Sequence, residues 1–130
     1  MMTSFPTTED ILALAGAMLP AVDVRDGGQL HASVLRPQTS AFGEDAYPDL
    51  WEKAAALMHG IVLGHPLVDG NKRLGWAAAV AFLEDNGEIL EYRDVDEAES
   101  VVISLAKGEL DDIPDLARRL RGLGRRPEAE

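Results

Sequence analysis

The sequence contains no cysteine, which excludes disulfide scaffolds, cysteine zinc sites and thiol catalysis. Its longest uninterrupted apolar run is Trp76 to Leu83, eight residues, whereas a membrane-spanning helix needs about 20. No basic residue precedes Arg25 and no long apolar segment lies near the first residues, so we expect no signal peptide. These absences predict a soluble, cytoplasmic protein that makes no contact with a membrane.

Basic residues are also scarce, with 12 against 23 acidic residues and a formal net charge of −11. Because non-specific binding to nucleic acid depends on neutralising phosphates, we expect no direct nucleic-acid binding. The charge is uneven: Glu84 to Asp115 holds twelve acidic and two basic residues, whereas five basic residues lie between Arg118 and Arg126. We interpret these as a solvated acidic face and a basic helix end; the alternative is that one of them meets a charged partner.

The 130 residues are 46% hydrophobic, which is enough to bury a core and too many for a disordered chain. A chain of this length accommodates one domain of ordinary size. No internal repeat or low-complexity linker divides it. We therefore predict a single domain over residues 1–124, followed by a disordered tail over residues 125–130.

The first third of the chain favours two helices and an irregular segment. The apolar pattern predicts a helix from about Glu9 to Leu19, which Pro20 ends. Asp26-Gly27-Gly28 is interpreted as a turn, and Leu30 to Leu35 as a short second helix that Pro37 stops. Between Pro37 and Pro48 the helical pattern breaks, and we expect a loop or a small hairpin there, of the kind that is usually functional in compact domains.

Helical periodicity returns at Leu50, where apolar residues recur at three- and four-residue spacing: Leu50, Ala54, Leu57, Met58, Ile61 and Val62. This helix should end near Gly64, because Pro66 favours an extended conformation at His65. Residues 74–83 are apolar on all sides, which predicts a second helix buried at the centre of the fold and ended by Asn86-Gly87. Further helices are expected over residues 95–106 and 113–120. No long segment alternates with period two, so the predicted fold is all-α with at most one short β-hairpin.

An unusual group of side chains occupies residues 65–73, between the two most apolar helices. It contains an imidazole, a carboxylate, an amide, an ammonium and a guanidinium. Unpaired backbone N–H groups and a positive dipole end lie at a helix N-terminus. Gly70 would allow close approach of a ligand, and Lys72 and Arg73 add positive charge. Together these features predict a phosphate cradle.

Each of these residues also has a simpler interpretation. Asp69 could be a helix N-cap or could hold a divalent cation that bridges nucleotide phosphates. His65 could be a structural turn histidine or a general base. Lys72 and Arg73, taken singly, could be ordinary surface charges. His31 and His59 lack comparable neighbours and are interpreted as structural.

Two other motifs are rejected. The P-loop pattern fails because five residues, rather than four, separate Gly64 from Gly70, and because Asn71 follows Gly70. A zinc site is not expected either, because no second His or Glu lies four residues along a helix from His65.

The run His65-Pro66-Leu67-Val68-Asp69-Gly70-Asn71-Lys72-Arg73 closely resembles the motif of the Fic/Doc superfamily. The Fic adenylyltransferases usually carry Gly between the Asn and the first Arg, whereas the Doc (death-on-curing) toxins carry Asn-Lys-Arg, as Asn71 to Arg73 do here. Leu67 departs from the Phe that is most common in the family, where this residue packs under the loop, and we expect Leu67 to keep that role.

The resemblance implies an α-helical fold with the motif loop between two central helices. It implies the toxin of a type II toxin–antitoxin system, paired with a Phd-like antitoxin. Doc-like proteins are kinases that move the γ-phosphate of ATP to a hydroxyl of a translation elongation factor of the Tu type. Two alternatives remain open: an adenylyltransferase that uses the same cradle, and a catalytically silent module that only pairs with an antitoxin.

Transferred residue by residue, the resemblance assigns a role to each motif position. His65 would deprotonate the target hydroxyl, Asp69 would hold Mg²⁺, and the remaining positions would bind and neutralise the phosphates of ATP: Gly70, Asn71, Lys72 and Arg73. A flap that aligns the target chain by main-chain pairing would include Ser40, Ala41, Phe42 and Gly43. Some Fic proteins carry an inhibitory helix with the spacing of Ser40 to Glu44, but Gly43 argues against a helix here.

Overall fold

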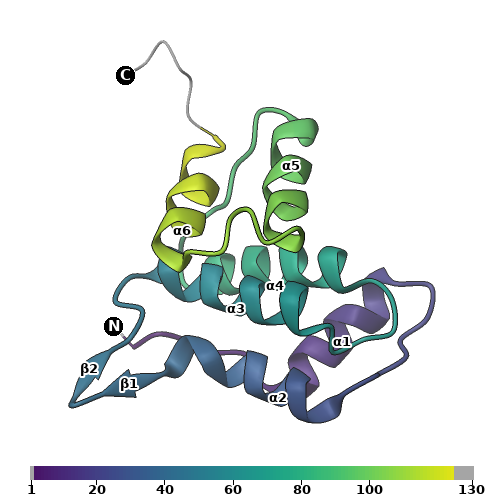
Figure 1. The fold of residues 1–130 in the computed structure, drawn as a ribbon. Coiled ribbons are helices and arrows are strands. Elements are labelled where there is room, and N and C mark those ends of the chain that lie inside the picture. Colours follow the sequence, from purple (N-terminus) through teal and green to yellow (C-terminus); the bar gives the residue numbers. More distant parts are fainter. Residues whose placement is uncertain (1, 125–130) are drawn as a thin grey trace.

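The computed structural model describes residues 2–124, and the expected tail over 125–130 lies outside them. Within this range the chain forms six α-helices, one 3₁₀ turn and one hairpin (Figure 1). In chain order these elements are α1 (Thr8–Met18), α2 (Gly27–Leu35), η1 (Arg36–Gln38), β1 (Ser40–Ala41), β2 (Glu44–Asp45), α3 (Leu50–Gly64), α4 (Asn71–Asp85), α5 (Val95–Ala106) and α6 (Ile113–Gly122). The predicted all-α fold with one short hairpin is confirmed.

The helices are arranged in three levels around α3 and α4, which pack side by side through the middle of the molecule (Figure 1). Helices α1 and α2 cover one side of this pair, while α5 and α6 cover the other. The motif loop connects the end of α3 to the start of α4, so it lies between the two central helices as predicted. None of the described helices is long and apolar enough to cross a membrane.

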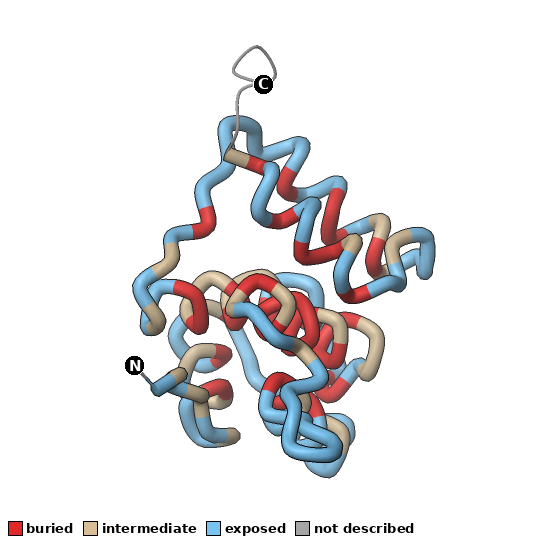
Figure 2. Tube along the Cα trace, turned by 90° about the vertical axis from the view of Figure 1, so that its left-hand side faces the viewer, coloured by how far each residue is buried: buried red, intermediate tan, exposed pale blue. Residues whose placement is uncertain are grey.

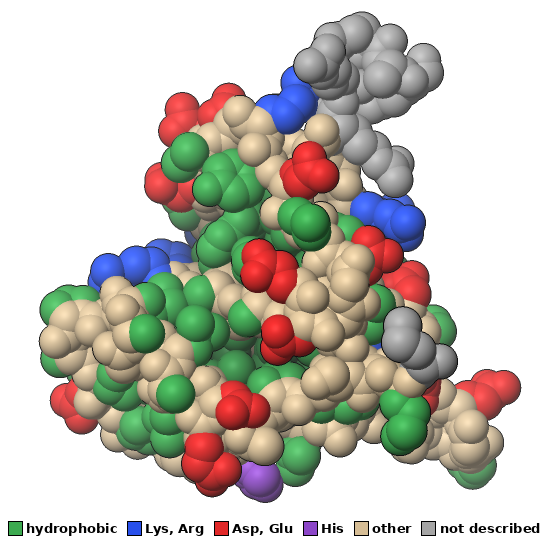
Figure 3. All heavy atoms as spheres, turned by 180° about the vertical axis from the view of Figure 1, so that it is seen from behind, with side chains coloured by type: hydrophobic (Ala, Val, Ile, Leu, Met, Phe, Trp, Pro, Cys, Tyr) green, Lys and Arg blue, Asp and Glu red, His purple; other side chains and the backbone are tan. Residues whose placement is uncertain are grey.

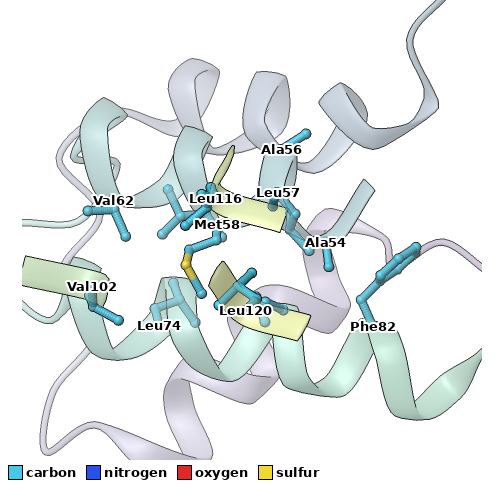
Figure 4. Packing of buried hydrophobic residues seen from close by; sticks show 14 of the residues in the cluster. Ala54, Ala56, Leu57, Met58, Val62, Leu74, Phe82, Val102, Leu116 and Leu120 are labelled. Atoms are coloured by element: carbon cyan, nitrogen blue, oxygen red, sulfur yellow. The ribbon is translucent and has the colours of Figure 1, made fainter. Parts of the chain in front are cut away.

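The core is centred on α3, whose residues from Trp51 to Met58 are buried apart from Glu52 (Figure 2). Met58 of α3 lies close to Leu74 of α4 and to Leu116 and Leu120 of α6 (Figure 4). The two central helices approach closely at Gly75, where a Cβ atom would lie 2.6 Å from Cγ2 of Val62. This close contact fixes the relative position of the two helices that hold the motif loop.

Short polar side chains begin five of the helices. The hydroxyl of Thr7 accepts the backbone N–H of Asp10, whose carboxylate accepts the N–H of Thr7 in return, which completes a capping box at α1. Aspartates cap four others by accepting a backbone N–H in the first turn: Asp26 at α2, Asp49 at α3, Asp94 at α5 and Asp112 at α6. The exception is α4, whose N-cap residue, Gly70, has no side chain to accept such a bond.

Two expectations about the helices were wrong. Helix α2 begins at Gly27, so Gly27 and Gly28 are helical rather than part of a turn, because the Asp26 carboxylate accepts the N–H of Gln29 and starts the helix earlier. Helix α4 is not buried all round: one side is only half-buried, at Trp76, Ala77, Val80 and Ala81. Two residues of that side, Trp76 and Ala81, line grooves against neighbouring helices.

The hairpin occupies the segment between Pro37 and Pro48, with Ala41 paired to Glu44 and Ser40 to Asp45. Phe42 lies at its tip with a positive φ of 54° and a fully exposed side chain. Because Ser40–Ala41 and Glu44–Asp45 are strands, the segment does not form the inhibitory helix whose spacing it shares. The prediction that this spacing is a coincidence is confirmed.

Candidate active site

His65 ends helix α3 and begins the motif loop. Its backbone has φ 49° and ψ 55°, which is the left-handed region, and its side chain is exposed. The expected extended conformation is therefore wrong. The left-handed geometry also avoids the right-handed helical conformation that a following proline disfavours, and it turns the chain sharply away from the axis of α3.

The motif loop is held by the segment that connects α1 to α2. Val24 and Leu67 form an isolated antiparallel bridge, and Val68 N–H donates to Asp23 O at 2.8 Å. The backbone N–H groups of Arg25 and Asp26 both donate to the carbonyl of Pro66, at 2.8 and 3.0 Å. These contacts join distant parts of the chain and set the path of the loop.

Arg25 also contacts the loop through its side chain. Its Nε donates to the carbonyl oxygen of His65 at 2.6 Å, and Nη2 donates to that of Gly64 at 3.0 Å. Arg25 was not among the candidate site residues predicted from the sequence. The only sequence signal is that Arg25 is the first basic residue of the chain, which does not point to a contact 40 residues away.

Leu67 and Asn71 form the inner side of the loop. Leu67 is 1% exposed, which confirms that it packs under the loop. The Asn71 amide binds both backbone groups of Leu67, because Oδ1 accepts its N–H and Nδ2 donates to its carbonyl, each at 2.9 Å. In this conformation the buried Asn71 side chain shapes the loop; its predicted contact with phosphate stays a prediction.

Gly70 precedes α4 with φ 91°, a conformation that favours glycine. A Cβ atom at this position would lie 2.8 Å from Cδ1 of Leu19. Its backbone N–H donates to Oδ1 of Asp69 at 2.8 Å. Gly70 therefore brings the loop against α1 and turns it into the first turn of α4.

A small cavity of about 230 Å³ lies beside Asp69 and Gly70, and Arg73 and Leu19 also line it. It brings a carboxylate and a guanidinium to one place at the N-terminus of α4. Within residues 2–124 no three His, Asp or Glu side chains gather as a ready-made metal cage. Asp23 also lines this cavity, and two exposed carboxylates there fit Mg²⁺, which is usually held by one or two carboxylates together with nucleotide phosphates.

Lys72 and Arg73 occupy the first turn of α4 and are exposed. Both also line a larger groove of about 400 Å³ between α4 and α5, whose remaining walls are mostly apolar: Met18, Trp76, Tyr92, Val95, Ala98, Glu99, Val102 and Ile103. The rings of Trp76 and Tyr92 meet edge to face, with 5.8 Å between centroids. Figure 3 shows basic side chains beside hydrophobic surface where the α5 level meets the rest of the molecule.

The comparison with protein families gives a direct match. The Fic/DOC family matches residues 5–83, which contain the hairpin and the whole motif. The chain belongs to the Fic/Doc family. It is also 44% identical to the protein "Toxin Doc" of Mycolicibacterium smegmatis over 123 residues, which cover 93% of this chain and 94% of that protein.

The residues from His65 to Arg73 form one continuous segment around the end of α3 and the start of α4. The hairpin lies apart from it. Lys53 of α3 binds the hairpin segment through the Asp45 carboxylate, at 3.0 Å, and through the carbonyl of Tyr47. Figure 1 shows the hairpin near the start of α3, whereas His65 follows its end. A helix of 15 residues is about 22 Å long, so the structure does not bring Ser40, Ala41, Phe42 and Gly43 next to His65.

Proposed function

We propose that this protein is the toxin of a toxin–antitoxin pair and a kinase that transfers the γ-phosphate of ATP to a hydroxyl of a translation elongation factor of the Tu type. The observation that carries the proposal is the intact run from His65 to Arg73 at the N-terminus of α4. Lys72 stands where Fic adenylyltransferases carry Gly, and it adds a long cation that a terminal phosphate can use. The similarity to a protein named "Toxin Doc" supports the same class.

Phosphoryl transfer mainly requires that the reacting groups are positioned and that the charge of the phosphates is neutralised. The exposed imidazole of His65 is free to accept the proton of an incoming hydroxyl. Lys72 and Arg73 lie in the first turn of α4, where their charge adds to the positive end of the helix dipole. All three groups belong to the run from His65 to Arg73, and the proposal assigns them to one reaction centre.

Asp69 is the residue that would hold Mg²⁺, because its exposed carboxylate lies beside the cavity that Arg73 also lines. When bound, the ion would neutralise phosphate charge and orient the nucleotide. Oδ1 of Asp69 already accepts the N–H of Gly70, which fixes the direction of the carboxylate. The protein thus supplies an oriented ligand, and the nucleotide would supply others.

The test is transfer of label from ATP to an elongation factor in a bacterial extract. We expect label from the γ position and none from the α position; label from the α position instead would favour the adenylyltransferase alternative. His65→Ala should lower the rate by about 10²–10⁴, the usual contribution of a positioned general base. His31→Ala is the matched control, because His31 is an exposed histidine on α2 that contacts Thr8 rather than the loop. Its rate should stay at the wild-type value.

The silent-module alternative is tested in the cell. Production of the wild-type chain without a partner should arrest the growth of a bacterial host, and His65→Ala should relieve the arrest. Growth arrest that persists in His65→Ala would show that the loop chemistry is not its cause. A folded, abundant and harmless wild-type protein in several hosts would contradict the toxin proposal.

The groove between α4 and α5 supports the partner part of the proposal. Its walls include large apolar side chains that are well exposed, such as Val95 at 64%. An apolar helix of a Phd-like antitoxin would cover them, and the acidic stretch from Glu84 to Asp115 favours a basic tail on that antitoxin. Since Lys72 and Arg73 line the same groove, an occupant would also cover these two cations of the first turn of α4.

A pair of matched substitutions tests the groove. Val95→Asp should weaken binding of the product of the neighbouring gene by about tenfold or more, since it places a charge in an apolar contact. Ile89→Asp is the control, because Ile89 is 67% exposed but does not line the groove. Equal affinities of the two variants would indicate that the antitoxin binds another surface of the protein.

A further inference from the structure

We propose that Arg25 is a positioning residue for His65. The inference deepens the proposed function, because it rests on His65 being the base of that reaction. The observation is that three consecutive carbonyl oxygens, those of Gly64, His65 and Pro66, all accept hydrogen bonds from Arg25. Two come from its guanidinium and one from its backbone N–H.

The guanidinium lies where α3 leaves its last carbonyls without partners. The end of a helix carries unpaired C=O groups and the negative end of the dipole, and a cation there is stabilising. Nε and Nη2 of Arg25 belong to one rigid plane, so they bind the two adjacent oxygens as a fork. The contact therefore fixes the direction of both peptide groups around the Cα of His65.

His65 needs such a constraint, because its left-handed backbone is unusual for a residue with a side chain. A conformation of this kind persists only when its surroundings over-determine it. No side chain other than that of Arg25 hydrogen-bonds the backbone of Gly64 or His65 within the described residues. Since the backbone of His65 sets where its imidazole can point, Arg25 acts on the candidate base through the main chain.

The backbone of Arg25 is fixed in turn. Its N–H and that of Asp26 share the carbonyl of Pro66, and the preceding residue, Val24, pairs with Leu67. Asp26 also caps α2. The backbone on either side of Arg25 is therefore held by hydrogen bonds, and this fixes the point from which the guanidinium reaches the loop.

The experiment compares Arg25→Ala, Arg25→Lys and a control, Arg93→Ala, by steady-state kinetics and by NMR of His65. Arg93 is exposed, and its side chain makes no hydrogen bond within residues 2–124. Arg25→Ala should lower kcat by about 10–100-fold, the effect of a misplaced reacting group, while KM for ATP stays within about twofold because Lys72 and Arg73 are unchanged. The Cα chemical shift and amide coupling of His65 should move away from their left-handed values.

Arg25→Lys keeps the charge but loses the fork, so it should recover only part of kcat and of the His65 NMR signature. Arg93→Ala should match the wild type in both measurements. Assays are run at a temperature where circular dichroism shows native helix content for every variant. If Arg25→Ala keeps the wild-type kcat or the wild-type His65 signals there, the inference is wrong.

The two proposals fail in different ways. If the wild-type chain transfers no phosphate, the kinase proposal falls, while the NMR comparison still decides whether Arg25 holds the backbone of His65. If the wild type is active and Arg25→Ala is equally active, only the inference about Arg25 falls.

Discussion

Arg36 and His59 are joined by a short hydrogen bond, with 2.6 Å between Nη1 of the arginine and Nδ1 of the histidine. Because a guanidinium only donates, Nδ1 must accept, and the ring proton lies on Nε2, which donates to Asp111 at 2.7 Å. Arg36 also donates to the hydroxyl of Tyr47. These hydrogen bonds connect η1, α3 and the segment before α6, so His59 has polar neighbours that the sequence did not reveal, and they give it a role in joining these elements.

His59→Ala should therefore lower the free energy of unfolding by about 1–3 kcal/mol, because it leaves the Arg36 guanidinium with an unmet donor. Asp111→Ala should cost less than about 1 kcal/mol, since the Asp111 side chain is 69% exposed. Urea denaturation measures both. If the two substitutions lower the free energy of unfolding equally, the argument that the less exposed His59 contributes more than the exposed Asp111 is wrong.

Gly70→Ala should destabilise the protein more than Gly87→Ala. Both glycines have positive φ, 91° and 86°, but a Cβ atom would clash with Leu19 at Gly70 and meets nothing within 4 Å at Gly87. Gly87→Ala should cost about 1 kcal/mol for the backbone alone, and Gly70→Ala about 1–3 kcal/mol more for the overpacking. If the two variants have the same urea midpoint, the loop can move away from Leu19 without a loss of stability.

A comparison of Asn71 with Asn86 distinguishes an effect on the geometry of the motif loop from an effect on the stability of the whole protein. Asn71 binds Leu67, and Asn86 ties Ser4 to the end of α4 with the same amide groups. Replacing either by alanine should lower stability by about 1–3 kcal/mol through unmet backbone partners. Only Asn71→Ala should also relieve growth arrest at a temperature where both variants are folded. Relief by Asn86→Ala as well would mean that stability alone explains the effect.

Because the pKa of Glu52 is raised, we expect the stability of the protein to depend on pH. Partial burial, and then the neighbouring carboxylate of Asp49, raise the pKa of Glu52 above its ordinary value. A group whose pKa is raised on folding stabilises the folded state at low pH, and that stability is lost as the pH rises through its pKa. Glu52→Gln should therefore be favourable relative to wild type at pH 7, and the difference should shrink toward pH 4. Denaturation at both pH values measures it; a difference that grows on acidification would contradict the sign.

The sequence predicts the helices well because their signals are local. Apolar spacing placed α1, α3, α5 and α6 within two residues of their observed ends. Local patterns do not reveal tertiary surroundings, which is why α4 was expected to be buried on every side. Its residues Trp76 and Val80 are apolar, but the neighbouring helices cover them only in part.

The motif was recognised from sequence because its polar residues stand close together in an apolar region. Two properties of the site were hidden. The left-handed backbone of His65 is accompanied by hydrogen bonds from Arg25, 40 residues away, and the distance of the hairpin from the loop depends on the whole length of α3. Both arise from residues that are far apart in the chain, and periodicity contains no information about such contacts.

The bridge between Val24 and Leu67 can open without unfolding of the helices, which would disrupt the motif loop. The bridge and the neighbouring backbone hydrogen bonds form a short unit whose 20–26 side is mostly exposed, and short units of this kind open with less free energy than a buried core. Opening of residues 20–26 would free the loop while α3, α4 and α6 stay packed. Inactivation and unfolding are then separate events, and amide hydrogens of the loop should exchange with solvent long before those of α3.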